Sequence, residues 1–169
     1  GMPAIALTDH GTMFGAVEFF NKAKAAEVKP IIGLETYVAP RRMTDRDPHY
    51  DKSPFHLLLL AENMTGWKNL LKIASDSQME GFYYKPRIDH EYLAAHADGL
   101  IATTACLAGE VPQALANRQE ERAIELLDFY FDVFGRDRFF LEYQRHDLEE
   151  LEYVNQRLLQ LSKRYNAHN

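Results

Sequence analysis

Four residues far apart in the chain carry side chains of the types that most often hold metal ions. They are His10, Glu35, His56 and Cys106. Imidazole, carboxylate and thiolate donors together suit zinc or a similar divalent ion. The spacings between them are long, so no compact motif such as Cys-x-x-Cys identifies a site. Residue types alone therefore raise a metal centre as a hypothesis.

Each candidate ligand also has a plainer interpretation. His10 follows Asp9, whose carboxylate is equally suited to cap a following helix. Glu35 interrupts an apolar run, where it must face solvent, pair with a cation or bind metal, because a buried unpaired carboxylate is costly. His56 fits a hydrogen-bonded histidine at the start of a strand, and Cys106 fits a small buried apolar residue. Tertiary structure is needed to decide between these alternatives.

The apolar pattern predicts alternating strands and helices that would position these residues. A short apolar run over residues 4–8 stops at Asp9-His10, and Gly11 opens the turn. We expect strands over residues 4–8, 30–38, 55–61, 99–104 and 139–143, and helices over residues 14–26, 65–79 (capped by Asn63 or Thr65), 90–97, 110–116, 119–134 and 148–165. This alternation predicts a largely parallel α/β sheet or barrel. Ligands and metals collect at the carboxyl ends of such strands.

Two histidines fit this strand-end rule differently. His146 follows the strand expected over residues 139–143, although a lone histidine there is also typical of a surface position. His56 instead follows a polar, proline-containing loop over residues 40–54 and lies near the start of the strand over residues 55–61. That is the wrong end of the strand for a site built at the carboxyl ends of parallel strands. The four leucines after His56 predict a strand buried on both faces.

A segment rich in aromatic and basic residues covers positions 80–89. Lys85 and Arg87 are candidates to bind phosphate oxygens, with Tyr83 and Tyr84 stacking on bases. Alternatively, the two cations extend over the rim of the fold with their aliphatic stems packed on it.

The composition is that of a globular domain of 169 residues, with 46% hydrophobic and 26% charged residues. A net charge of −6 argues against strong, independent, non-specific binding to nucleic acid. Cys106 is the only cysteine, so no disulfide forms within the chain and a reducing cytoplasm is the expected compartment. No apolar run is long enough for a transmembrane helix, so we expect no membrane association. Residues 1–3 and 166–169 look like cuts through a larger fold.

Several segments together resemble the polymerase and histidinol phosphatase (PHP) domain family. The resemblance rests on GMPAIALTDHGTMFGAVEF and KPIIGLETYVAP, then on HLLLLAEN, EGFYYKPRID, ACLAGEVP and, more loosely, FLEYQRH. It covers nearly the whole chain. The segment at residues 80–89 is similar to the branch found in bacterial replicative DNA polymerases. The implied fold is a distorted TIM-like β/α barrel of seven strands, and residues 1–169 would be one part of it, incomplete at both ends.

The resemblance also implies roles for individual residues. The metal ligands would be His10, Glu35, His56 and Cys106, with Glu35 bridging two ions, and Glu35 and His10 would be the catalytic candidates. Asp9 matches a position that supports a neighbouring ligand, and His146 has a weaker counterpart. Two groups of the family, an opening His-x-His strand and a closing Asn-Asp-x-His segment, are absent from this chain. It is therefore expected to bind fewer ions than a complete domain.

The implied chemistry is metal-assisted phosphoester hydrolysis, with zinc as the expected ion and manganese or magnesium as alternatives. In a polymerase this would be 3′–5′ proofreading. DNA would then be contacted mainly through other domains, other replicase subunits would be partners, and this chain alone would bind DNA weakly or not at all. Two alternatives remain: a non-catalytic, metal-stabilised module that docks other parts of the polymerase, and a free-standing PHP phosphatase.

Overall fold

The computed structural model describes residues 1–165 as a mixed α/β fold with six strands and six helices. The strands are β1 (Ala4–Leu7), β2 (Lys29–Val38), β3 (Phe55–Ala61), β4 (Arg87–Ile88), β5 (Leu100–Thr103) and β6 (Phe139–Phe140). The helices are α1 (Ala16–Ala25), α2 (Met64–Met79), α3 (His90–Ala95), α4 (Glu110–Ala116), α5 (Glu120–Phe134) and α6 (Glu149–Tyr165). Residues 166–169, where the sequence suggests a cut through a larger fold, lie outside the described part.

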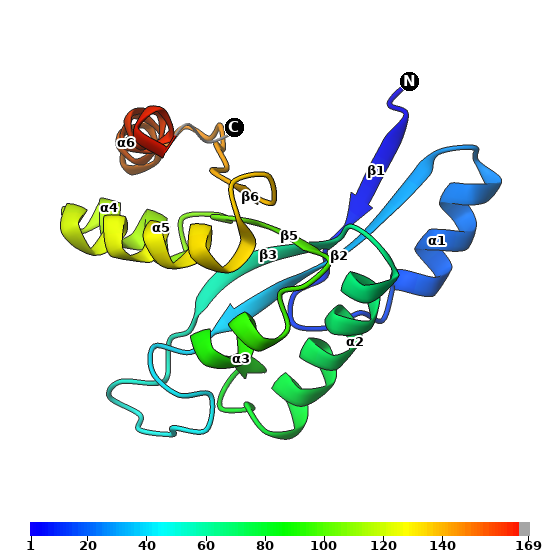
Figure 1. Cartoon of the computed structure of the whole chain (residues 1–169), viewed down its shortest axis with the longest axis horizontal. Coiled ribbons are helices and arrows are strands. Elements are labelled where there is room, and N and C mark those ends of the chain that lie inside the picture. Colours follow the sequence, from blue (N-terminus) through cyan, green and yellow to red (C-terminus); the bar gives the residue numbers. More distant parts are fainter. Residues whose placement is uncertain (166–169) are drawn as a thin grey trace.

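The strands form one open sheet in the order β1-β2-β3-β5-β6, and β4 pairs with the end of β2 (Figure 1). Both β1 and β4 run parallel to β2, and β6 runs parallel to β5. In contrast, β3 runs antiparallel to both of its neighbours, β2 and β5. The expected largely parallel arrangement is therefore wrong for β3. The connection explains the difference, because a parallel return needs a crossover, usually a helix, and residues 39–54 contain none.

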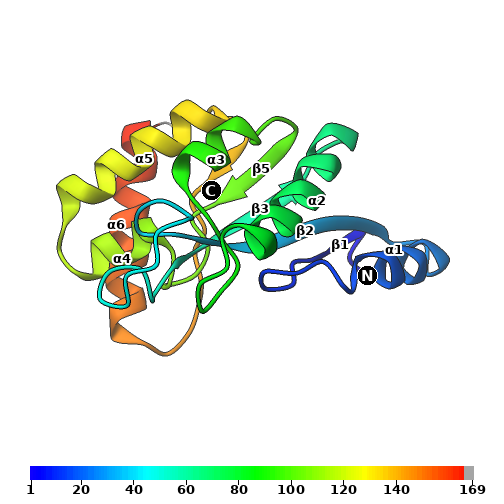
Figure 2. The ribbon, with the colours of Figure 1, turned by 90° about the horizontal axis from the view of Figure 1, so that it is seen from below.

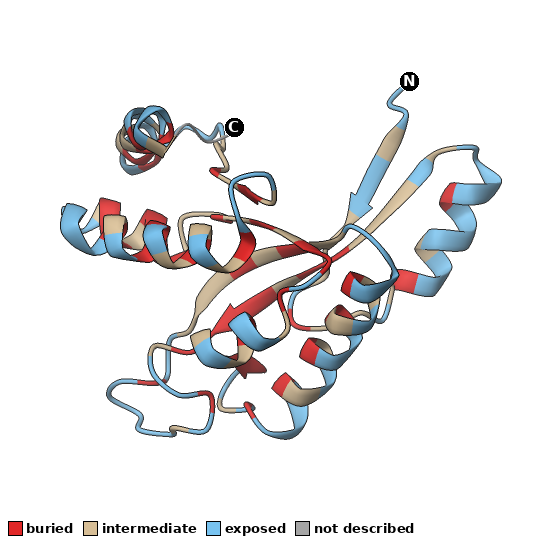
Figure 3. Cartoon of the chain, viewed as in Figure 1, coloured by how far each residue is buried: buried red, intermediate tan, exposed pale blue. Residues whose placement is uncertain are grey.

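One face of the sheet carries the hydrophobic core. Alternate residues of the two central strands point to this face and are at most 1% exposed: Leu34, Val38, Leu57 and Leu59. Leu70 and Ile73 of α2 belong to the same buried cluster, and α5 contributes a stripe that includes Leu127 and Tyr130. Figure 3 shows these buried stripes on the sides of α2 and α5 that face the sheet.

The opposite face of the sheet is only partly covered. Leu58 and Leu60 of β3 point to this face and are half-buried, unlike Leu57 and Leu59. The expectation of a strand buried on both faces is therefore wrong within the described residues. Figures 1 and 2 show α1 beside β1 at one end of the sheet and α4, α5 and α6 grouped at the other.

Several local expectations are confirmed, and one strand is shorter than expected. Asn63 caps α2, since its side chain accepts hydrogen bonds from the backbone N–H groups of Thr65 and Gly66 at 2.9 and 3.1 Å. The strand expected over residues 139–143 is reduced to β6, because the chain after Phe140 makes no further ladder with β5. None of the helices within residues 1–165 combines the length and the apolar character needed to cross a membrane.

Candidate metal centre

The end of β1 brings His10 beside Glu35. The parallel pairing of β1 with β2 continues past Leu7, because the Glu35 N–H donates to the Asp9 carbonyl at 3.1 Å and the Gly11 N–H donates to the Glu35 carbonyl at 2.9 Å. His10 and Glu35 thus occupy paired positions on neighbouring strands. Their side chains meet on one face, with His10 Nε2 3.2 Å from Glu35 Oε1.

The start of β3 brings His56 to the same place. His56 pairs with Tyr37 across the antiparallel ladder, and Tyr37 shares a sheet face with Glu35 because the two lie two residues apart in β2. His56 Nδ1 lies 2.6 Å from Glu35 Oε1. Since β3 runs against β2, the first residues of β3 lie beside the carboxyl end of β2. A residue near the start of β3 can therefore join a site at the carboxyl end of β2.

A tight loop after β5 brings Cys106 to the same ring nitrogen of His56 that Glu35 contacts. The Cys106 Sγ lies 3.6 Å from His56 Nδ1, and the His56 N–H donates to the Ala108 carbonyl at 2.9 Å. Ala105 has a φ of 56°, a left-handed conformation that is uncommon for residues other than glycine. A Cβ on Gly109 would come within 2.2 Å of the Thr104 carbonyl oxygen, so the loop closes only with glycine at that position.

Hydrogen bonding shifts the titration of three of these groups. The Cys106 thiol and the Glu35 carboxylate raise the pKa of His56 to about 9. In return, the hydrogen bond with His56 lowers the pKa of Glu35 and that of Cys106 against the opposing effect of burial. The cluster thus places two acidic side chains, those of Glu35 and Cys106, beside the His56 ring.

The donor set fits a divalent metal ion. One ligand atom each from His10, Glu35 and His56 lies within 4.8 Å of the others. Ligand atoms that share a tetrahedral zinc ion at about 2.0–2.3 Å are about 3–4 Å apart, so small adjustments would suffice. Cys106 adds a sulfur donor on the His56 side. The His10 side chain is 58% exposed, against 17% for Glu35 and 21% for His56, so the centre is open on the His10 side.

The sequence matches the PHP domain family over residues 1–146. The chain belongs to the PHP domain family. It is 49% identical over 165 residues to DNA polymerase III subunit alpha of Thermus aquaticus, which covers 96% of this chain and 13% of that protein. It is 48% identical over 164 residues to the subunit of the same name of Borreliella burgdorferi, covering 96% of the chain and 14% of the relative. The Deinococcus radiodurans subunit is 49% identical over 152 residues, 88% of the chain and 11% of the relative. This PHP chain thus spans about one seventh or less of the length of these relatives.

Within residues 1–165, the side chains of two predicted supporting residues of this PHP chain contact other groups than the four candidate ligands. The Asp9 carboxylate accepts a hydrogen bond from the Gly15 N–H at 3.2 Å and so holds the turn that leads into α1. Because Gly15 precedes the first residue of α1, this bond stabilises the turn and is not a cap on the helix itself. His146 lies in the exposed segment between β6 and α6, where it lines a cavity of about 710 Å³ together with residues of α6. Within residues 1–165, no contact joins His146 to the four candidate ligands.

The two predicted phosphate-binding cations differ completely in their surroundings. Arg87 is 0% exposed, and its guanidinium donates to the backbone carbonyls of Gly81, Asp51, Met43 and Asp45 at 2.8–3.0 Å. Its expected contact with a phosphate is therefore wrong, because no donor of the group faces solvent. Lys85 is exposed, and its Nζ lies 5.4 Å from the centroid of the Tyr37 ring.

Sequence reasoning missed Tyr37 and Gly109 as parts of this centre. The Tyr37 ring packs edge-on against the His56 ring with centroids 5.1 Å apart, and it is 6% exposed. Strand alternation from Glu35 was the available signal for Tyr37. No comparable signal existed for Gly109, because its close approach to Thr104 arises only when the loop folds.

Proposed function

We propose that this chain is part of the PHP domain of a bacterial-type replicative DNA polymerase subunit and that it supplies part of a divalent metal centre for phosphoester hydrolysis. The convergence of His10, Glu35 and His56 within 4.8 Å carries the proposal. The similarity to DNA polymerase III alpha subunits supports the polymerase context. Polymerisation itself, other replicase subunits as partners and a cytoplasmic location belong to the same proposal for the full-length protein.

The complete domain would close the open sheet into a seven-stranded barrel. Within residues 1–165, β1 and β6 are the two ends of the strand order and leave unpaired edges. Segments outside residues 1–169 would cover these edges and provide the remaining ligands that the family resemblance implies. The exposed side of His10 is the open approach to the centre.

His10, Glu35, His56 and Cys106 would hold the metal. Zinc is the preferred ion because the set mixes nitrogen, oxygen and sulfur donors, with manganese or magnesium as alternatives. A bound ion of this kind lowers the pKa of a bound water and stabilises negative charge on phosphoryl oxygens. Glu35 contacts both His10 and His56, and this contact supports the proposal that it would bridge two ions. The reaction in a polymerase would be removal of 3′-terminal nucleotides from DNA.

The test uses the full-length gene product with Glu35→Gln and His10→Ala substitutions. Glu121→Gln and His49→Asn are matched controls, because both side chains are exposed and lie outside the centre. Metal content by mass spectrometry, 3′–5′ exonuclease activity and primer extension are measured on each protein. We expect the two site variants to lose metal and exonuclease activity while primer extension persists.

Two other results identify the alternatives. If the site variants lose metal, thermal stability and primer extension together, and the unchanged protein has no nuclease activity, the centre is a structural and docking element. A free-standing phosphatase would hydrolyse a small ester such as p-nitrophenyl phosphate and would have no polymerase region in its reading frame. Unchanged metal content in both site variants would overturn the proposed centre.

A further inference from the structure

A second group of residues adjoins the proposed metal centre on the side of Tyr37. The Lys85 ammonium lies 5.4 Å from the centroid of the Tyr37 ring. The same ring also packs against the His56 ring, with their centroids 5.1 Å apart. One buried ring therefore separates an exposed lysine from a candidate metal ligand.

The residue before Lys85 in the chain is a tyrosine whose exposed ring has a lysine of its own beside it. Tyr84 is 56% exposed, packs edge-on against Tyr83 with centroids 4.7 Å apart, and has the Lys52 Nζ 5.5 Å from its ring centroid. Lys52 comes from the loop between β2 and β3, whereas Tyr84 and Lys85 come from the segment before β4. We call Lys52, Tyr84 and Lys85 the lysine–tyrosine shelf.

The backbone at the shelf is strained. Tyr84 has a φ of 59°, which is unfavourable for a bulky side chain. Among residues 1–165, the other non-glycine residues with positive φ are Glu27, Ala105 and Arg118. Glu27 and Arg118 follow the ends of α1 and α4, where a left-handed residue is usual, and Ala105 adjoins Cys106. Strain of this kind persists where surrounding contacts over-determine it, and it concentrates at functional sites.

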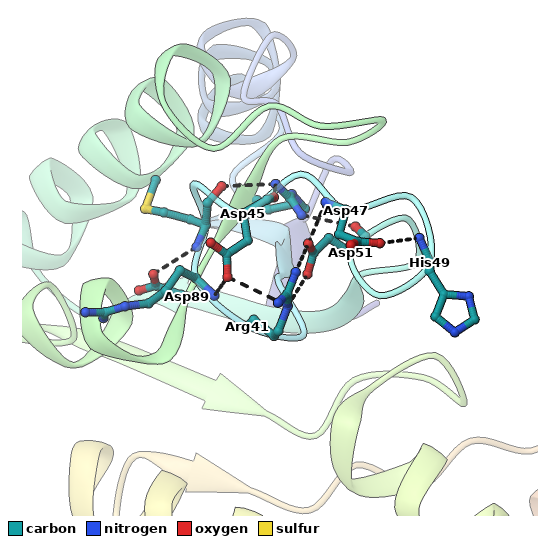
Figure 4. Close-up of polar contacts among 9 residues, drawn as sticks. Arg41, Asp45, Asp47, His49, Asp51 and Asp89 are labelled. Atoms are coloured by element: carbon teal, nitrogen blue, oxygen red, sulfur yellow. Dashed lines mark hydrogen bonds and ion pairs between the residues drawn. The ribbon is translucent and has the colours of Figure 1, made fainter.

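Arg87 supplies those surrounding contacts. Its four hydrogen bonds to backbone carbonyls tie the loop that carries Lys52 to the turn that carries Tyr84 and Lys85. Figure 4 shows the further polar contacts that fix the first loop. The buried Asp51 carboxylate accepts bonds from Arg41 at 2.9 and 2.6 Å, and Asp89 accepts one from the Met43 N–H at 2.9 Å. The shelf is thus built on a rigid support.

The two lysines of the shelf retain charge that no carboxylate neutralises. Within residues 1–165, neither Lys52 nor Lys85 takes part in an ion pair, whereas the nearby Arg41 and Arg42 pair with Asp51 and Glu91. Ammonium groups bind phosphates, and an exposed aromatic ring stacks on a base of any identity. A small phosphate ester has only one phosphate and cannot contact the second lysine or the ring. A strand of several nucleotides offers further phosphates and bases that can contact both.

We propose that the lysine–tyrosine shelf binds the last nucleotides at the 3′ end of single-stranded DNA and holds that end toward the metal centre. The proposal rests on the proposed function and assigns the residues that bind its DNA substrate. Lys85 would contact the phosphate nearest the centre, Tyr84 would stack on a base, and Lys52 would contact a further phosphate. Arg87 is a positioning residue that acts through the two loops.

Photo-crosslinking tests binding independently of hydrolysis. The probe is a single-stranded oligonucleotide with 5-iodo-deoxyuridine near its 3′ end, added to the full-length protein and irradiated, with crosslinked peptides identified by mass spectrometry. We expect a crosslink at Tyr84. It should persist in the Glu35→Gln variant, because stacking does not need the metal centre. Crosslinks confined to other parts of the protein would overturn the shelf even if the nuclease is active.

Kinetics with matched substitutions provide the second readout. Lys85→Met keeps the apolar stem, Tyr84→Phe keeps the ring and Tyr84→Leu removes it, and Lys68→Met is the control because Lys68 is an exposed lysine on α2. For Lys85→Met and Tyr84→Leu we expect KM for the oligonucleotide to rise several-fold, and to rise more than KM for p-nitrophenyl phosphate does. Loss of one phosphate contact should reduce the slope of log KM against log salt by about 0.7. Tyr84→Phe and Lys68→Met should match the unchanged protein. Equal KM values for all four variants would overturn the shelf, whereas Tyr84 crosslinking without any nuclease activity would support the shelf and contradict the proposed function.

Discussion

His56 and Glu35 meet across an antiparallel strand pair, with Nδ1 2.6 Å from Oε1, although His56 is the second residue of its strand and Glu35 lies in the second half of its own. The reversed direction of β3 produces this contact. It places the start of β3 beside the carboxyl ends of β1 and β2, where His10 also lies. The Cys106 loop then closes the cluster from β5.

Removing metal should destabilise the protein only when the cluster is intact. An ion that binds the folded state stabilises it by about 2.7 kcal/mol when its free concentration is 100 times Kd. We expect a chelator to lower the melting temperature of the PHP region in the unchanged protein and in His49→Asn, and to leave that of Glu35→Gln almost unaltered. Differential scanning calorimetry makes the comparison. Equal chelator effects on all three proteins would contradict the assignment of Glu35.

The substitution Gly109→Ala should disturb the centre without touching a ligand. Its Cβ would lie 2.2 Å from the Thr104 carbonyl oxygen, so the loop must move and take Cys106 with it. We expect lower metal content at limiting metal concentration, measured by equilibrium dialysis. Ala94→Ser on the exposed side of α3 is the control. If Gly109→Ala binds metal as tightly as the unchanged protein does, the loop geometry is not what holds Cys106 in place.

Neighbouring leucines of β3 should differ in their contribution to stability. Leu59 is 0% exposed on the core face, so Leu59→Ala should cost about 2–5 kcal/mol through lost contacts and a cavity. Leu58 is half-buried on the site face, and Leu58→Ala should cost less. Urea denaturation followed through the PHP region measures both. A larger loss for Leu58 would mean that the site face is more fully packed in the full-length protein than it is in residues 1–165.

The Arg41–Asp51 pair should make stability depend on acid pH. Hydrogen bonding from Arg41 lowers the pKa of Asp51 from 3.8 to about 2. A depressed folded-state pKa contributes stability above the unfolded value of 3.8, and this contribution is lost as pH falls from 3.8 toward 2. The stability difference between the unchanged protein and Asp51→Asn should thus be constant at neutral pH and shrink below about pH 4.

Denaturation midpoints of the two proteins from about pH 7 down to about pH 3 test this dependence. Glu121→Gln serves as the comparison because its side chain is exposed and has no recorded partner within residues 1–165. A difference that stays constant through the acid range would show that Asp51 titrates at its ordinary pKa and that Arg41 does not stabilise its charge.

The sequence by itself determined most of the helices and strands, with β4 as an exception, and the family to which the chain belongs. Local signals predict these elements without tertiary information. They are the apolar periodicity of α5 and α6, the Asn63 cap and the run of leucines in β3. The four candidate ligands were also identifiable, because their types and the matching segments around them are written in the sequence.

Only the tertiary structure decided how these elements combine. The direction of β3 depends on pairing between segments distant in sequence. Because β3 runs antiparallel to β2, His56 near its start lies beside Glu35. The burial of Arg87 depends on hydrogen bonds to four backbone carbonyls from two loops, which no local sequence pattern predicts. Its guanidinium binds these carbonyls and is not available to a phosphate. Residue types set what chemistry is available, whereas long-range pairing and burial decide which side chains can take part in it.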